Sequence, residues 1–189
     1  MNLLTLAINA ILIENLILMK FLGICPFIGL SKRKRTAIGI SFASIFVMTI
    51  SSILSYFIYY KILVPYNMEY LKTIVFILVI ATFVQLTEII IKSISKTLVK
   101  TLGIYLPLLT TNCAILGVAL ISVNSDFNLL EVIIYSISSA LGFMLVMYIF
   151  ASLRERLDKS PIPKSFKGLP IAFVTAAILS MIFTQYIGA

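Results

Sequence analysis

The chain predicts an all-α integral membrane protein, with six transmembrane helices that form two inverted three-helix repeats and with interrupted first and fourth helices. Three observations predict this fold class. Of its 189 residues, 61% are hydrophobic and only 12% are charged, whereas about a quarter of the residues of a soluble domain are charged. The mean hydropathy is +1.12. The apolar residues fall into six long stretches, and two of these contain similar cysteine motifs.

Each apolar stretch approaches or exceeds the roughly 20 residues that a membrane-spanning helix needs. The loops between them are short, so we expect one membrane domain over residues 1–189 and no soluble domain. Residues 1–21 lack a basic n-region and a small-residue cleavage site, so they belong to the first span and not to a removable signal peptide. In chain order the predicted spans are 3–30, 37–64, 71–91, 98–121, 129–153 and 169–187.

Basic residues set the orientation of these spans. The net charge is +8, and twelve of the fifteen basic residues lie in three regions, namely the loops after the first, third and fifth spans together with the start of the fourth span at Lys100. By the positive-inside rule these loops are cytoplasmic and both termini lie outside. The charge therefore predicts a topology in a lipid bilayer and no nucleic-acid partner. The twelve residues are Lys32, Arg33, Lys34, Arg35, Lys92, Lys96, Lys100, Arg154, Arg156, Lys159, Lys164 and Lys167.

The two cysteines of the chain occur in matching contexts. Cys25 and Cys113 each begin a Cys-x-x-x-Gly motif, and they are 88 positions apart (113 minus 25). Shifting the first half by this distance places the second span over the fifth. With three spans in each half, the second copy enters the membrane from the opposite side. We therefore expect an inverted repeat, with repeat 1 at about 1–93 and repeat 2 at about 94–189.

Helix-breaking residues stand beside both cysteines. Pro26 lacks a backbone donor and disfavours helix at Cys25, and Gly23 adds backbone freedom. A continuous helix from Leu3 would place Cys25 roughly 33 Å along its axis, beyond the bilayer midplane, so a broken or re-entrant segment is favoured. In the second copy, Pro107 precedes Thr110, Thr111 and Asn112, whose side chains accept or donate the hydrogen bonds that a break leaves open.

Several roles for the thiols remain open from the residues alone. Buried cysteines often pack as small hydrophobic side chains, and disulfides form in oxidising compartments. The chain has no histidine, so a metal would be held by sulfur, carboxylate or backbone oxygen. Iron–sulfur clusters usually take four cysteine ligands, and zinc competes for four thiolates. Either metal would require two further ligands from a partner or a second copy.

Two polar residues within the spans are further candidates. Glu14 lies in the first span and Asn112 precedes Cys113, and ionisable or polar groups at membrane depth mark functional sites or helix–helix hydrogen bonds. An inverted-repeat transporter of small molecules or ions, and a structural scaffold within a larger assembly, fit the same pattern. A transporter would tolerate serine at both cysteines, whereas a cluster-bearing membrane protein would not.

Long segments of the chain resemble one family of membrane proteins. This family includes the A-type component of the Rnf electron-transport complex and the related E-type component of the sodium-pumping NADH:quinone reductase. The resemblance covers nearly the whole chain and is most specific around the cysteines. The segments that carry it are Gly23–Lys32, Leu102–Leu120, Thr73–Ala81, Gln85–Glu88 and Leu153–Leu157.

The resemblance implies a function and a cofactor. Family members pair with a homologous subunit of opposite topology, and the pair holds a [2Fe–2S] cluster with two cysteines from each chain. Cys25 and Cys113 would be the ligands from this chain. The protein would carry electrons across a bacterial or archaeal cytoplasmic membrane, between reduced ferredoxin and NAD, coupled to sodium or proton translocation. Flavins and the nicotinamide site would belong to other Rnf subunits, and this chain would have no catalytic substrate site of its own.

Overall fold

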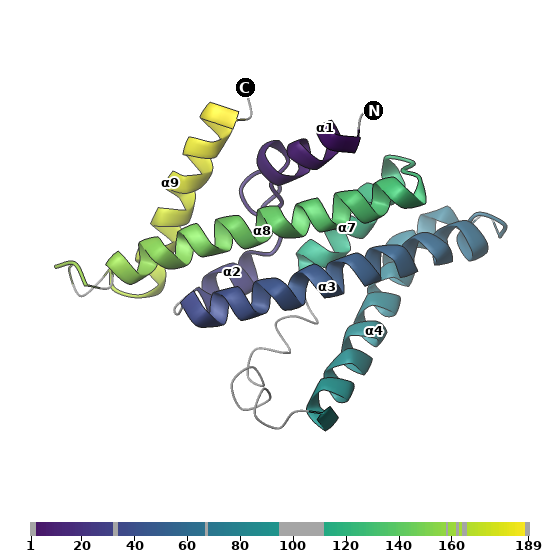
Figure 1. The fold of residues 1–189 in the computed structure, drawn as a ribbon, viewed down its shortest axis with the longest axis horizontal. Helices are drawn as coiled ribbons and strands as arrows, with labels where there is room; N and C mark the ends of the chain where they lie inside the picture. The colour runs from purple at the N-terminus through teal and green to yellow at the C-terminus, as the bar shows by residue number, and fades with distance from the viewer. Residues whose placement is uncertain are drawn as a thin grey trace. The chain divides into compact units, whose positions relative to one another are not determined.

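The computed structural model describes residues 3–31, 34–66, 68–94, 112–157, 159–161, 163 and 166–187. Every regular element among these residues is a helix (Figure 1), which confirms the predicted all-α class. The chain divides into two compact units. The first consists of Met1–Ala43 and Ser138–Ala189, and the second of Ser44–Ile137. The helices α3 (Lys34–Ile58) and α8 (Leu129–Leu157) contribute to both units.

The first unit contains the N-terminal segment and the last helix. Its elements are α1 (Leu3–Ile8), a π-helical turn (Asn9–Ile13), α2 (Ile24–Leu30), the beginning of α3, the last part of α8, and α9 (Leu169–Ile187). The helices α2 and α9 are in contact. Fully buried side chains from the N-terminal segment and from α8 form the core of this unit, namely Leu16, Phe27, Phe143, Met147 and Phe150.

The second unit is built around the later part of α3 and the beginning of α8. The helix α3 continues as a π-helical turn (Tyr59–Leu63), and a 3-10 turn (Glu69–Leu71) leads into α4 (Lys72–Ile94). The helix α7 (Cys113–Asn124) packs against α4. Near the end of α7, Asn124 accepts a hydrogen bond of 2.6 Å from the Nζ of Lys72. The core side chains of this unit are Met48, Phe76, Ile115, Val118 and Val132.

Local sequence explains where several helices begin. At the start of α8, the Glu131 carboxylate accepts a hydrogen bond of 3.0 Å from the backbone N–H of Asn128, which satisfies a donor that the helix leaves open. At the start of α9, Gly168 has a φ of +96°, a conformation that glycine adopts without a steric penalty. Pro170 follows in the first turn of α9, where its missing N–H costs no helical hydrogen bond.

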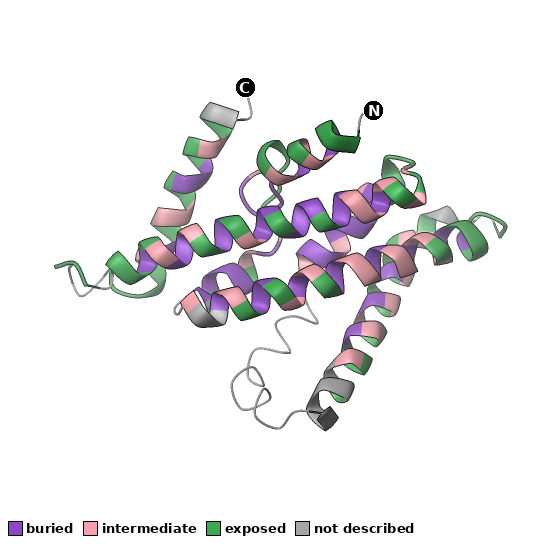
Figure 2. Cartoon of the chain, viewed as in Figure 1, coloured by how far each residue is buried: buried purple, intermediate pink, exposed green. Residues whose placement is uncertain are grey.

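The lengths and surfaces of the helices agree with a membrane protein. Within the part of the chain that the structure describes, two of them, Ala37–Leu63 and Leu129–Leu157, are long and apolar enough to cross a membrane by length and composition. Burial alternates along α8 (Figure 2), so the helix has core-facing and outward-facing sides. Outward-facing side chains on α4 and α9 include the large apolar residues Leu78, Phe173 and Met181. Exposed apolar surface of this kind suits contact with lipid or protein and not with water.

Four of the predicted spans coincide with helices of the structure. The helices α4, α8 and α9, and α3 together with the π-helical turn that follows it, begin and end within a few residues of these spans, a margin typical of sequence-based boundaries. The first predicted span is divided into α1, a π-helical turn and α2. Of the predicted span 98–121, only Asn112 and the part in α7 belong to the described residues.

Candidate functional site

The N-terminal segment is interrupted before Cys25. The helical hydrogen bonding of the π-helical turn ends at Glu14, whose φ of −95° and ψ of +41° lie outside the helical region. The chain then runs through turns to Gly23, where α2 begins. Phe21 and Gly23 have positive φ angles of +54° and +83°. The left-handed conformation of Gly23 suits a residue without a Cβ atom and reorients the backbone immediately before α2.

The predicted interruption of the first segment is therefore present, but Pro26 does not cause it. Cys25 and Pro26 both lie in the first turn of α2, so the prediction that Pro26 breaks the helix at Cys25 is wrong. A proline in the first turn loses no helical hydrogen bond, because the N–H groups of that turn have no partner within the helix. The break instead begins at Glu14, where the helical hydrogen bonding ends, and closes at the left-handed Gly23 before α2.

The side chain of Asn15 stabilises the interrupted backbone through hydrogen bonds. Asn15 is 1% exposed. Its Nδ2 donates to the carbonyl of Ile11 at 3.3 Å and to the carbonyl of Gly142 on α8 at 3.1 Å. Its Oδ1 accepts a hydrogen bond of 3.1 Å from the N–H of Ile17. The amide thus replaces helical hydrogen bonds that the break removes and ties the segment to α8.

Glycine at position 142 allows this close approach. A Cβ atom at Gly142 would lie 2.8 Å from the carbonyl oxygen of Ile11 and 3.2 Å from the Nδ2 of Asn15. Contacts this short between a Cβ atom and backbone are strongly repulsive. Sequence patterns identified neither Asn15 nor Gly142, since their contact joins residues that are 127 positions apart.

Two side chains of α8 hold the short helix that carries Cys25. The ring of Phe27 stacks on that of Phe150, with ring centroids 4.1 Å apart and an interplanar angle of 23°. One turn further along α8, the guanidinium of Arg154 donates to the carbonyl of Ile28 at 2.6 Å and to the Ser31 hydroxyl at 2.9 Å. Arg154 is 3% exposed. It therefore binds the C-terminal end of α2, where the carbonyl groups lack helical donors.

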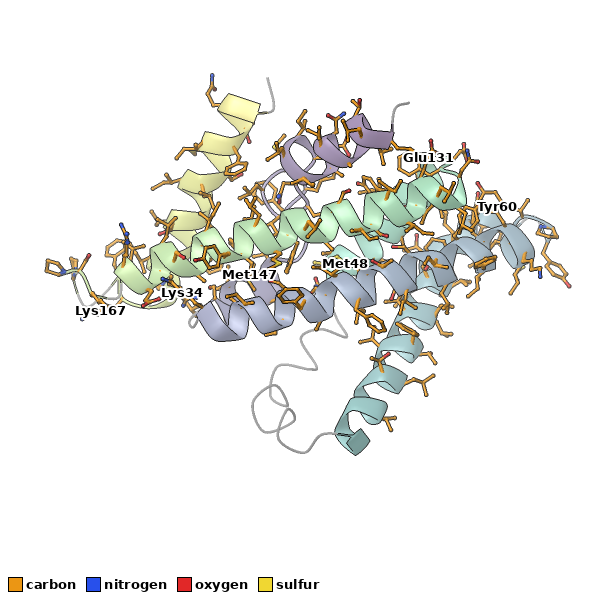
Figure 3. The ribbon with its side chains drawn as sticks, in the orientation of Figure 1. Lys34, Met48, Tyr60, Glu131, Met147 and Lys167 are labelled. Carbon is orange, nitrogen blue, oxygen red and sulfur yellow. The ribbon has the colours of Figure 1, made fainter. Side chains whose placement is uncertain are left out.

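The position of Arg154 differs from the prediction, which assigned it to a cytoplasmic loop. The helix α8 extends to Leu157 and includes it. The next residue, Glu155, forms an ion pair of 3.1 Å with Lys34, which lies at the beginning of α3 and is labelled in Figure 3. The last turn of α8 thus carries both a buried cation that binds α2 and a partly exposed ion pair.

Cys25 is the second residue of α2 and is exposed, whereas Pro26 and Phe27 beside it are buried. One side of the short helix therefore packs against the unit, and the thiol lies on the accessible side. Neither Cys25 nor Cys113 is in a disulfide among the described residues.

Cys113 occupies a comparable position in the second unit. It is the first residue of α7 and is partly exposed. Asn112 caps this helix: its Oδ1 accepts a hydrogen bond of 3.1 Å from the N–H of Ala114, and its carbonyl accepts one of 3.1 Å from the N–H of Ile115. The proposed break at Pro107, Thr110 and Thr111 lies outside the described residues.

Glu14 has a local partner. Its carboxylate is 4.0 Å from the Nζ of Lys20, and both side chains are about half exposed. An ion pair of this length and exposure contributes little to stability. Cys25 and Glu14 belong to the first unit, and Cys113 and Asn112 to the second. The described residues contain no group of three or more His, Cys, Asp or Glu side chains that could hold a metal ion.

These features define a class of protein: a helical membrane protein with an interrupted first segment and two thiols in the first turns of helices. Comparison with known proteins agrees with this class. Residues 3–188 match the family described as Rnf-Nqr subunit, membrane protein. The chain belongs to this family.

Individual relatives are similar over nearly their whole length. The chain is 50% identical over 183 residues to the A component of the ion-translocating oxidoreductase complex of Actinobacillus pleuropneumoniae serotype 5b, a match that covers 97% of this chain and 95% of the relative. It is 48% identical over 188 residues to the A component of the Na+-translocating ferredoxin:NAD+ oxidoreductase complex of Acetobacterium woodii, covering 100% and 98%. A relative from Aeromonas hydrophila is 49% identical over 185 residues, covering 98% and 96%.

Proposed function

We propose that this chain is the A component of an ion-translocating ferredoxin:NAD+ oxidoreductase, and that it carries electrons across the membrane through a [2Fe–2S] cluster shared with a second membrane protein of the complex. The names of relatives at 48–50% identity support the complex and the place of this chain in it. The proposal of a cluster is argued from the residues of this chain. The observation that carries it is that each cysteine lies in the first turn of an apolar helix and is not fully buried.

The donor set fits such a cluster. Iron–sulfur clusters are held by cysteine thiolates, and each of these thiols lies where a second chain can approach: Cys25 is exposed and Cys113 partly so. Beside Cys113, the Nδ2 of Asn112 is buried and finds no acceptor in the described structure, as expected where an additional group binds. In this proposal Cys25 and Cys113 supply two ligands, and a homologous membrane subunit of opposite topology supplies two more.

The residues around the thiols favour their role as ligands. The N–H groups at the start of α7 and its dipole favour a negatively charged group beside Cys113. Pro26, Phe27, Ala114 and Ile115 are buried beside the two cysteines and exclude water from their inner sides. Asn15, Arg154 and the stacked pair of Phe27 and Phe150 fix α2 and therefore the backbone of Cys25. When bound, the cluster supplies one-electron transfer.

The composition of the two units supports an inverted repeat within this chain. If the first span corresponds to the fourth and the third to the sixth, then α2 corresponds to α7 and α9 to α4. The contact of α2 with α9 in the first unit then has its equivalent in the contact of α7 with α4 in the second unit. On this basis the chain forms one membrane domain with repeats at about 1–93 and 94–189, both termini outside, and further subunits of the complex bound to it.

The cysteine ligands can be tested spectroscopically in the whole complex. Cys25→Ser and Cys113→Ser should each abolish one EPR signal of the reduced complex while the other subunits still co-purify. Ser125→Ala is a matched control, because Ser125 is exposed at the other end of α7, roughly 18 Å from Cys113 along the helix axis. It should retain every signal. If both cysteine variants retain all signals of the wild type, the proposed ligands are wrong.

A further inference from the structure

Asn112 has a buried hydrogen-bond donor that the described structure does not use. The side chain is 4% exposed. Its Oδ1 accepts a hydrogen bond of 3.1 Å from the N–H of Ala114, and this bond fixes the plane of the amide at the N-terminal end of α7. The other half of the amide, Nδ2, has no hydrogen-bond partner in the part of the chain that the structure describes. A donor that is removed from water without an acceptor destabilises a fold by about 1–3 kcal/mol. A hydrogen-bond acceptor from outside the chain would therefore stabilise the protein.

Asn15 provides an internal comparison, because it is also a buried asparagine, 1% exposed against 4% for Asn112. Its Nδ2 donates to the carbonyls of Ile11 and Gly142, and its Oδ1 accepts from the N–H of Ile17. The amide of Asn15 is therefore used in full by the chain. Asn112 uses only its oxygen, and the difference points to a ligand beside Cys113 as the missing acceptor.

The chemistry of this position selects an anionic acceptor. Asn112 directly precedes Cys113, and the first N–H groups of a helix together with its dipole attract negative charge. If the proposed function is correct, the anionic atoms at this position are the sulfurs of the cluster. We propose that the Nδ2–H of Asn112 donates a hydrogen bond to a sulfur of the cluster next to Cys113, and thereby raises the reduction potential of the cluster.

The direction of the effect follows from electrostatics. Reduction adds one negative charge to the cluster, and a hydrogen-bond donor stabilises the more negative form. Hydrogen bonds to the sulfurs are among the factors that set the potentials of iron–sulfur clusters. Asn112 acts here as a positioning and tuning residue and not as a ligand. Removing its donor should therefore lower the potential without removing iron.

The test is an EPR-monitored redox titration of the purified whole complex. Asn112→Ser keeps a side-chain oxygen that caps α7 but removes the amide donor. At a fixed potential near the midpoint, the ratio of reduced to oxidised cluster should fall about tenfold, a downward shift of about 59 mV for a one-electron couple. Asn112→Asp keeps the shape and the cap but replaces the donor by an acceptor, so its shift should be larger. Asn124→Ser, at the other end of the same helix, should leave the potential unchanged.

The outcomes separate this inference from the proposed function. If the wild-type complex has no signal that depends on Cys25 and Cys113, the proposed function fails. If that signal is present and its potential is the same in Asn112→Ser, Asn112→Asp and wild type, only the role of Asn112 is refuted. Loss of the signal in both Asn112 variants would also refute the tuning role, because Asn112 would then be required for cluster assembly.

Discussion

Replacing Gly142 by alanine should destabilise the protein, although alanine is normally the better helix former. Gly142 lies within α8, and a Cβ atom there would be 2.8 Å from the Ile11 carbonyl oxygen, 3.2 Å from the Ile11 Cα and 3.2 Å from the Asn15 Nδ2. Two of these three atoms are backbone, so rotation of a side chain cannot relieve the contact. Either α8 or the interrupted segment has to move.

The magnitude follows from two opposing terms. Overpacking of this kind costs about 1–3 kcal/mol, whereas replacing glycine by alanine inside a helix gains about 0.5–1 kcal/mol. The net loss for Gly142→Ala is therefore about 1–2 kcal/mol. Gly39→Ala is the matched control in α3, since a Cβ atom at this position would have no neighbouring atom within 4 Å. It should gain about 0.5–1 kcal/mol.

Thermal unfolding in detergent measures the difference between the two variants. The helix-propensity gain is common to both variants, so the gap between them is the overpacking cost of about 1–3 kcal/mol, which corresponds to roughly 2–12 °C for a chain of this size, with Gly39→Ala the more stable protein. Equal melting temperatures for Gly142→Ala and Gly39→Ala would refute the reasoning, because they would mean that α8 does not approach the interrupted segment at Gly142.

Three other substitutions test the contacts that hold α2 and the break. Asn15→Leu leaves the carbonyl of Gly142 and the N–H of Ile17 without their partner and should cost about 2–4 kcal/mol in thermal unfolding; a change below about 1 kcal/mol would contradict the role assigned to the amide. Arg154→Met removes two hydrogen bonds from a cation and should cost about 2–3 kcal/mol, whereas an unchanged melting temperature would show that α2 does not need this contact. Lys34→Ala removes an ion pair whose side chains are 41% and 46% exposed, so the loss should stay below about 1 kcal/mol.

Sequence patterns predicted the helical class and the positions of most helices because these depend on local composition. Long apolar runs bounded by charged or helix-breaking residues predicted α3 with its π-helical turn, α4, α8 and α9 within a few residues. The interruption of the first segment was also predictable, since an uninterrupted helix over residues 3–30 would be too long for the bilayer. Its cause was assigned to the wrong residue, because a proline in the first turn of a helix is well tolerated, whereas one further along is disruptive.

The contacts that build the site were beyond sequence patterns for a different reason. Asn15 and Gly142 meet through atoms far apart in the chain, and no periodicity records which carbonyl a side chain reaches. Arg154 follows a long apolar run and was assigned to a basic loop, yet it is buried against the end of α2. Its charge is compensated by a carbonyl and a hydroxyl, which hydropathy cannot reveal. The spacing of the cysteines and their matching motifs predicted the candidate ligands, and their ligation stays a prediction.

The most direct test of the central claim is the iron and acid-labile sulfide content of the purified complex. The wild type is compared with a double variant, Cys25→Ser with Cys113→Ser, that retains the other subunits. One [2Fe–2S] cluster held by these thiols predicts that the double variant loses two iron and two sulfide per complex. Equal iron and sulfide in the two complexes would contradict the claim that this chain holds a cluster.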